Sequence, residues 1–276
     1  MNVKLYPEEM LSDQLGLKVI IPGWKILNPC EKPLLSAVAI FSKTYYEGEM
    51  HKTPLVLIPG LLSDKTAWGY QAKHLSDIAD ATIISFHNED TPDKMVQAIL
   101  DQSPSQFALA GHSMGGWLAL EVMRYAPERV AKLCLLNTTA RPDSPDKLER
   151  RKQMIQMAKK GECFELAMQM SNALVFQESV KKEVQEMFLR RAPLRLICDQ
   201  KAMIQRGDCF SILPTIQVPT LIIHARQDQV FTLEMHEEMK NLIPNAKLAI
   251  VEDSGHMSPM EQPETVTRLM RHWLLG

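Results

Sequence analysis

The chain has 276 residues, of which 45% are hydrophobic, and a formal net charge of −2 at pH 7. This length and apolar content allow a sizeable buried core in one domain, or in one domain that carries a large insertion. Because the charge is near zero and no basic stripe dominates, the sequence disfavours a nucleic-acid-binding role and favours a small-molecule partner.

The cysteines and the hydropathy pattern limit the cellular setting. Five cysteines are scattered without a Cys-x-x-Cys pair, which indicates neither a disulfide framework nor a zinc site. They are Cys30, Cys134, Cys163, Cys198 and Cys209. Residues 1–10 carry no apolar run, and nowhere do about eighteen apolar residues follow one another. We therefore expect a cytoplasmic protein with no membrane span, metal or cofactor.

The first fifth of the chain gives the weakest pattern. Residues 1–50 hold two possible strands, at 18–21 and 37–46, and we treat them as an N-terminal segment of open role. The first clear element is the apolar run at 54–62, which is interrupted by a Pro-Gly pair. Such a run is typical of a buried parallel strand followed by a turn.

A helix, a strand and a second helix follow. Ser63 or Asp64 could cap the first helix, and residues 81–86 are expected to form a core strand. Thr91 and Pro92 then predict the start of the second helix, because proline is favoured in the first turn.

The next segment combines a strand, a sharp corner and a helix. Residues 107–110 are a short apolar run, and the apolar residues of 118–126 recur at helical spacing. Ser113 lies at the corner between them, with Gly111 and Gly115 two residues away on either side. Glycine is needed there because a side chain would collide with the neighbouring strand and helix. The pattern predicts a nucleophile elbow.

Three further strands are expected at 130–136, 219–224 and 246–251, and a helix at about 263–274. This alternation predicts an α/β fold with a mostly parallel, doubly wound sheet and helices on both faces. In such folds the loops at the carboxyl ends of the strands carry the chemistry.

The alternation stops between about residues 140 and 212, where the sequence is helical and rich in charge and methionine. We therefore divide the chain after the N-terminal segment into a core, 51–139 and 213–276, and a helical cap, 140–212. The methionines of the cap could line a site for an apolar substrate, although packing between helices explains most of them.

A serine hydroxyl needs a base within hydrogen-bond reach to become a nucleophile at neutral pH. Of eight histidines, His256 is the best placed, because it follows the strand at 246–251 and so lies at the edge where Ser113 emerges. His224 is expected inside a strand. His112 belongs to the elbow, but its side chain should point away from Ser113 and serve packing.

The base in turn needs an acid that orients it. Asp228 follows the strand at 219–224, which gives the order serine, acid, histidine found in α/β-hydrolases. The position after the strand at 130–136 is the other possible site, but it holds Asn137, which has no carboxylate. Asp143 lies further into the cap, and Asp253 is too close to the histidine in sequence.

A carbonyl attacked by serine also needs hydrogen-bond donors for the developing oxyanion. One expected donor is the backbone N–H of Met114, which follows the nucleophile. The second is the backbone N–H of Leu61, since Gly60 allows a close approach of the chain at the exit of the first strand. An ordinary turn explains Pro59-Gly60 equally well.

These residues together resemble the α/β-hydrolase superfamily. The resemblance rests on the elbow, the Pro-Gly strand exit, Asp228 and the Gly-His-Met-x-Pro-x-Glu-x-Pro-Glu segment at 255–264, and it spans about residue 55 to the C-terminus. It is strongest to small esterases, enol-lactonases and carboxyl methyl ester hydrolases, and implies an eight-stranded, mostly parallel sheet under a helical cap. Many relatives have His-Gly where this chain has Pro59-Gly60.

A serine at the elbow argues against dehalogenase and epoxide-hydrolase chemistry, both of which need a carboxylate nucleophile. We therefore expect hydrolysis of a carboxylic ester, lactone or thioester through an acyl-enzyme on Ser113, with Asp228 and His256 as partners. The same residues could serve perhydrolysis or carbon–carbon bond hydrolysis, and a ligand receptor could retain the pocket.

The cap also carries basic clusters, at Arg150-Arg151-Lys152, Lys159-Lys160 and Arg190-Arg191 with Arg195. They could receive an acidic substrate or an acidic carrier protein. Charge runs on amphipathic helices usually face solvent only, so the main expected partner is a small ester-type molecule.

Overall fold

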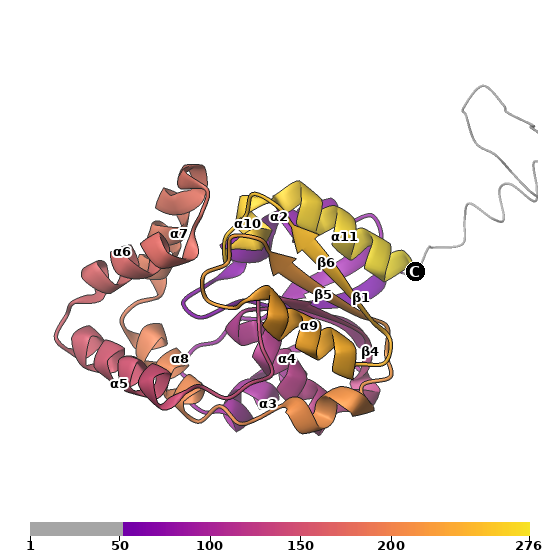
Figure 1. The fold of residues 1–276 in the computed structure, drawn as a ribbon, viewed down its shortest axis with the longest axis horizontal. Helices are drawn as coiled ribbons and strands as arrows, with labels where there is room; N and C mark the ends of the chain where they lie inside the picture. Colours follow the sequence, from indigo (N-terminus) through magenta and orange to yellow (C-terminus); the bar gives the residue numbers. More distant parts are fainter. Residues whose placement is uncertain (1–51) are drawn as a thin grey trace, which may run out of the picture. The chain divides into compact units, whose positions relative to one another are not determined.

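Six parallel strands form one sheet in the part of the chain that the structure, a computed structural model, describes, which is residues 52–276. The possible strands at 18–21 and 37–46 and the whole segment 1–50 lie outside the described residues. The strand order is β2-β1-β3-β4-β5-β6 (Figure 1). The bounds are β1 Thr53–Ile58, β2 Ala79–Ile83, β3 Phe107–His112, β4 Val130–Leu136, β5 Thr220–Ala225 and β6 Ala246–Val251.

The central strands are short apolar runs because both of their faces are covered. All six residues of β3 and of β5 are buried. One hydrophobic cluster, which includes Trp117, packs on one face, and a second cluster, which includes Trp68, packs on the other. The expected doubly wound α/β fold is therefore confirmed.

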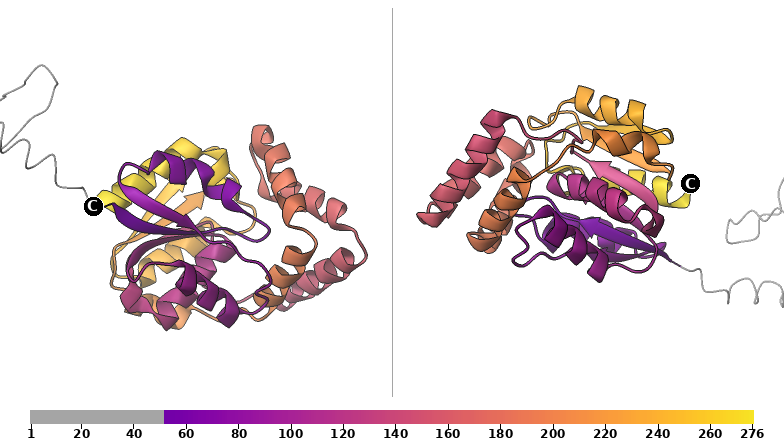
Figure 2. Two further views of the ribbon diagram at one scale, coloured as in Figure 1. Left: turned by 180° about the vertical axis from the view of Figure 1, so that it is seen from behind. Right: turned by 90° about the horizontal axis from the view of Figure 1, so that it is seen from below.

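Helices cover the two faces of the sheet in separate groups (Figures 1 and 2). Buried residues of α3, α4 and α9 belong to the first cluster, and residues of α2 and α11 belong to the second. Their bounds are α2 Gly69–His74, α3 Pro92–Gln102, α4 Met114–Tyr125, α9 Leu233–Leu242 and α11 Pro263–Leu275. The short elements are the 3₁₀ turns η1 Lys65–Trp68, η2 Pro127–Arg129 and η3 Phe210–Thr215, and the helix α10 Ser258–Glu261.

The strand order places a topological switch point beside β1. The chain leaves β1 for β2 on one side and then returns to β3 on the other side. Register pairs Leu57 with Ala110 and Ala110 with Cys134, so β1, β3 and β4 end at the same edge of the sheet. Open α/β sheets bind their ligands in the crevice at such a point.

The four helices between β4 and β5 form a group beyond one end of the sheet, apart from the helices that cover its two faces (Figures 1 and 2). They are α5 Pro145–Lys159, α6 Cys163–Leu174, α7 Glu178–Arg191 and α8 Leu194–Ile204. In pairs, α5 packs on α8 and α6 packs on α7. A third hydrophobic cluster joins the cap to the core, because it contains Met187 and Phe188 of α7 together with Leu62 and Met257.

Several local expectations differ in detail from the structure. The strand expected at 81–86 runs from Ala79 to Ile83. Asp64 caps a short 3₁₀ turn ahead of α2, since its carboxylate accepts a hydrogen bond from the Thr66 N–H at 2.8 Å. Thr91 caps α3 as expected. The described residues contribute six strands, whereas the family resemblance implies eight.

No helix in residues 52–276 is both long and apolar enough to cross a lipid bilayer.

Candidate active site

Ser113 lies on the corner between β3 and α4 in a strained backbone conformation, with φ 56° and ψ −117°. A Cβ on Gly111 would overlap the carbonyl oxygen of Gly115, and a Cβ on Gly115 would overlap that of Ile58. The corner is therefore compatible only with glycine at these two positions. The strained turn pushes the Ser113 side chain out at the carboxyl edge of the sheet.

His256 lies in the loop after β6 and is almost completely buried, with 3% of its surface exposed. Its Nε2 atom lies 2.8 Å from Ser113 Oγ, and its Nδ1 atom lies 2.9 Å from Asp228 Oδ2. A carboxylate only accepts, so Nδ1 carries the proton and Nε2 is free to accept the serine hydroxyl. The structure thus brings Ser113, His256 and Asp228 into one continuous chain of hydrogen bonds.

Asp228 follows β5, and its carboxylate is fully enclosed. The second oxygen, Oδ1, accepts hydrogen bonds from the N–H groups of Val230 at 2.7 Å and Phe231 at 3.3 Å. Burial raises the pKa of Asp228, but the charge of His256 and the hydrogen bonds outweigh it and hold the pKa below its ordinary value. Asp228 therefore stays ionised beside the imidazole.

Asn137 has a role that the sequence interpretation missed. Its Nδ2 donates to Asp228 Oδ2 at 2.8 Å, and its Oδ1 accepts from the Ser258 hydroxyl at 2.6 Å. From the sequence alone, the position after β4 is of interest only as a site for a carboxylate, which Asn137 lacks. The signal that could have found it is its place at the same sheet edge, where an amide can orient the acid of the neighbouring strand.

His112 was expected to serve packing alone, and the structure adds a hydrogen bond. Its Nε2 lies 2.7 Å from the backbone oxygen of His256, so Nε2 carries the proton and donates. Burial, reinforced by the charge of His256, lowers the pKa of His112 to about 3, which keeps its ring neutral. The residue before Ser113 therefore holds the backbone of the candidate base.

The two expected oxyanion donors lie beside Ser113. Met114 is the first residue of α4, where N–H groups have no partner within the helix. A Cβ on Gly60 would come within 3.3 Å of the Ser113 Cβ, so the turn that contains Leu61 touches the elbow. Within residues 52–276, neither the Leu61 N–H nor the Met114 N–H donates to another group of the protein.

Comparison with known proteins identifies the family. The model of the alpha/beta hydrolase fold family matches residues 84–263. The chain belongs to the alpha/beta hydrolase fold family.

Relatives of this alpha/beta hydrolase include several esterases. It is 27% identical over 188 residues to a pimeloyl-[acyl-carrier protein] methyl ester esterase of Nitrosomonas europaea. The aligned region covers 63% of this chain and 74% of the relative. It is 28% identical over 222 residues to the AB hydrolase superfamily protein YisY of Bacillus subtilis, and this alignment covers 75% of each chain.

Among solved structures, a thermophilic esterase from Thermogutta terrifontis is similar, with a TM-score of 0.72 and 29% identity over 80% of this chain and 89% of that one. The enol-lactonase from Burkholderia xenovorans, at 20% identity and a TM-score of 0.72 over 82% and 92% of the two chains, shares the fold. The resemblance found in the sequence is confirmed.

The cap of this alpha/beta hydrolase is joined to the loop that carries His256. The His256 N–H donates to the Leu174 oxygen at 2.8 Å. Glu261 accepts from the N–H groups of Phe176 and Gln177 through one oxygen, at 2.8 and 2.7 Å, and from the Met257 N–H through the other, at 3.0 Å. One buried carboxylate therefore ties the α6–α7 connection to the histidine loop.

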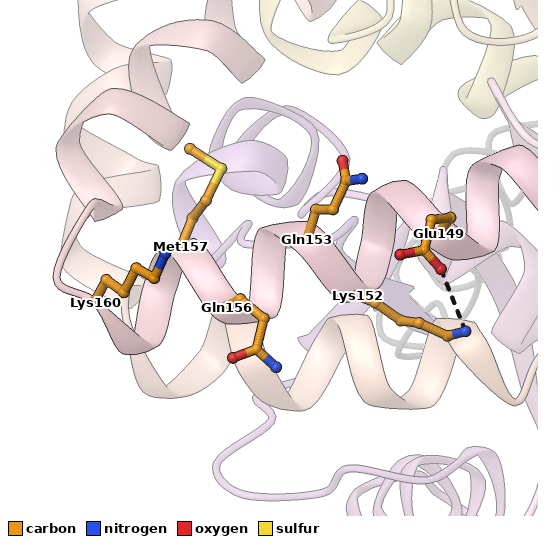
Figure 3. Close-up of a pocket in the computed structure, with 6 residues that line it drawn as sticks. All are labelled: Glu149, Lys152, Gln153, Gln156, Met157 and Lys160. Atoms are coloured by element: carbon orange, nitrogen blue, oxygen red, sulfur yellow. Dashed lines mark hydrogen bonds and ion pairs between the residues drawn. The ribbon is translucent and has the colours of Figure 1, made fainter.

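A hollow of about 380 Å³ lies elsewhere, along α5 (Figure 3). Its lining residues come from that one helix and the residue that caps its C-terminus: Glu149, Lys152, Gln153, Gln156, Met157 and Lys160. It contains none of the residues around Ser113, and its Glu149–Lys152 pair is 60% exposed on both sides. This hollow is a surface feature of the cap. In residues 52–276 no group of three His, Cys, Asp or Glu side chains is arranged to hold a metal ion.

Several basic residues of the cap are engaged inside the fold. Arg151 pairs with Asp143, and Arg190 pairs with Asp64. Arg191 donates to the Phe86 oxygen, and Arg195 pairs with Asp199. Of the basic clusters, Arg150, Lys159, Lys160 and Arg191 make no ion pair with a described residue, and Arg191 is held by the Phe86 oxygen, which leaves a smaller basic surface than the sequence suggests.

Proposed function

We propose that this alpha/beta hydrolase cleaves a carboxylic ester, lactone or thioester of a small, partly apolar molecule through an acyl-enzyme on Ser113. The proposal rests above all on the continuous hydrogen bonds from Ser113 Oγ to His256 Nε2 and from His256 Nδ1 to Asp228. His256 takes the serine proton during attack and delivers it to the leaving group, while Asp228 holds the imidazole and stabilises its charged form.

The free N–H groups of Leu61 and Met114 are the proposed donors to the oxyanion. They lie beside the elbow and have no acceptor among the described residues. Donors fixed in advance stabilise the tetrahedral intermediate without reorganisation during the reaction. After the leaving group departs, His256 activates a water molecule, which attacks the acyl-enzyme and releases the acid.

The names of the relatives support an ester-type substrate, because esterases recur among them. An acidic carrier protein is a weaker proposal. The Nitrosomonas europaea relative is named for an acyl-carrier-protein ester, but in this chain Arg151, Arg190 and Arg195 are used in ion pairs within the fold. A small molecule remains the proposed substrate.

The test is replacement of the nucleophile. Ser113→Ala should abolish hydrolysis of a short p-nitrophenyl ester and prevent labelling by a fluorophosphonate, whereas Ser105→Ala, at an exposed serine, should retain both. Full labelling of the Ser113→Ala protein contradicts the proposed nucleophile. A panel of esters, thioesters, lactones and carbon–carbon substrates, together with hydrogen peroxide as an alternative acyl acceptor, then separates the reactions that this site can support. Sustained turnover argues against a ligand receptor.

A further inference from the structure

A buried carboxylate of the cap touches the turn that follows β1. Asp199 lies on α8, and its Oδ2 accepts a hydrogen bond from the Leu62 N–H at 2.9 Å, across 137 positions of sequence. Asp199 is 1% exposed. Leu62 directly follows Leu61, whose N–H is one of the two proposed oxyanion donors.

The turn needs support from outside. It spans Gly60 to Ser63 and is closed by a hydrogen bond from the Ser63 N–H to the Gly60 oxygen at 3.1 Å. Leu62 adopts a φ of 58°, the left-handed region that is unfavourable for a leucine. Such a conformation persists only where the surrounding structure enforces it. The Leu61 N–H belongs to the first peptide of this turn, Gly60–Leu61, and its direction depends on the turn because that peptide adjoins the central Leu61–Leu62 peptide, whose N–H Asp199 accepts.

The other oxygen of Asp199, Oδ1, also accepts a hydrogen bond. The Arg195 Nε donates to Oδ1 at 2.7 Å. The same guanidinium donates to the backbone oxygen of Glu89 at 2.6 Å and lies 5.6 Å from the centre of the Phe86 ring. Both oxygens of Asp199 therefore face donors. An asparagine could accept only one of these hydrogen bonds, because its NH₂ group would face the other donor.

We propose that Asp199 is a positioning residue, which holds the Gly60–Ser63 turn so that the Leu61 N–H faces the oxyanion. The cap then does more than cover the substrate, since α8 completes the geometry of the oxyanion hole. This inference rests on the proposed function of Ser113.

The ionisation of Asp199 sets the conditions for a test. Burial raises the pKa of Asp199 to about 6, although Arg195, the Leu62 N–H and, more weakly, Arg191 of α7 oppose the rise. The carboxylate of Glu89 lies 3.6 Å from the same Arg195. At pH 8 the carboxylate is ionised, so it accepts from both donors.

A structural ion pair would give similar contacts, so the variants must separate stability from turnover. Asp199→Asn weakens the turn contact and the ion pair together. The double variant Arg195→Leu/Asp199→Leu removes both charges of the buried pair. Replacing both partners of a buried ion pair with apolar residues often preserves stability. The double variant still deprives the Leu62 N–H of its acceptor. Asp143→Asn is the matched control, because Asp143 is a buried cap carboxylate paired with Arg151 and has no hydrogen bond to the turn.

Each protein is assayed with p-nitrophenyl acetate at pH 8, and its melting temperature is measured. Loss of a whole oxyanion donor costs about 10²- to 10³-fold in kcat, so a misdirected donor should cost about 10- to 100-fold. We expect this loss in Asp199→Asn and in the double variant, with KM within about threefold. The control should keep its kcat within about threefold of the wild type.

The inference is overturned if Asp199→Asn keeps the wild-type kcat, if the double variant recovers kcat together with its melting temperature, or if Asp143→Asn loses as much kcat as Asp199→Asn. Should Asp199→Asn fail to fold, the double variant decides the question alone. Absence of turnover in the wild type overturns the proposed function and this inference together, whereas normal wild-type turnover with an unaffected double variant overturns only the inference.

Discussion

The His112 ring donates a hydrogen bond from Nε2 to the backbone oxygen of His256, at a distance of 2.7 Å. The residue before the candidate nucleophile is thereby connected to the backbone of the candidate base. Since 144 positions of sequence separate the two, this hydrogen bond fixes the loop after β6 against the elbow. The hydrogen bond between Ser113 and His256 depends on the same approach.

His112→Leu should therefore weaken both the fold and the reaction. A buried carbonyl that loses its donor costs about 1–3 kcal/mol, and a displaced His256 should lower kcat about tenfold. His112→Gln keeps an N–H near the position of Nε2 and should retain kcat within about threefold. Urea unfolding and ester hydrolysis measure the two effects, and equal kcat values for the two variants would contradict the role given to the hydrogen bond.

Asn137→Asp tests the amide that contacts the acid. The new carboxylate would replace the Nδ2 donor, now 2.8 Å from Asp228, with a second negative charge. Like charges at this distance raise one of the two pKa values, so we expect kcat at pH 8 to fall about 10- to 100-fold and to recover relative to the wild type as the pH is lowered. Asn241→Asp, at an exposed position on α9, should leave the pH profile unchanged.

Gly115→Ala should destabilise the elbow. The added Cβ would overlap the Ile58 oxygen and lie 2.7 Å from the Pro59 oxygen, and neither backbone group can move easily because β1 is a central strand. Overpacking costs about 1–3 kcal/mol and occasionally more, and a clash with two backbone oxygens belongs at the upper end of that range. Gly69→Ala is the control, because its Cβ meets nothing within 4 Å and the backbone there is already helical, so its effect on the free energy of unfolding should stay within about 1 kcal/mol. Similar melting temperatures for the two variants would show that the elbow tolerates a side chain.

The pH dependence of stability should report the environment of Asp228. Its folded-state pKa lies below the ordinary value of 3.8, so ionised Asp228 stabilises the fold above about pH 4 and this contribution is lost as the pH falls further. The difference in unfolding free energy between the wild type and Asp228→Asn should therefore be larger at pH 6 than at pH 3, by about 1 kcal/mol, because at pH 3 this carboxyl is mostly protonated in the unfolded chain but still ionised in the fold. Urea titrations at the two pH values measure it. A constant difference would contradict the lowered pKa.

The sequence by itself determined the features that depend on neighbouring residues. The elbow around Ser113 follows from glycine spacing between a buried strand and a helix. The α/β fold follows from the alternation of apolar runs and helical periodicity, which records burial on both faces of a parallel sheet. Asp228 and His256 could be singled out because each follows a strand, and the carboxyl ends of parallel strands meet at one edge.

Only the tertiary structure decided which distant groups touch. The amide of Asn137 on Asp228, the ring of His112 on the His256 oxygen and Asp199 on the Leu62 N–H all join segments 91 or more residues apart. No local pattern encodes these contacts, because a hydrogen bond between elements depends on strand order and helix packing rather than on periodicity. The sequence thus located the serine and its partners, whereas the packing of the cap and sheet determined what holds them in place.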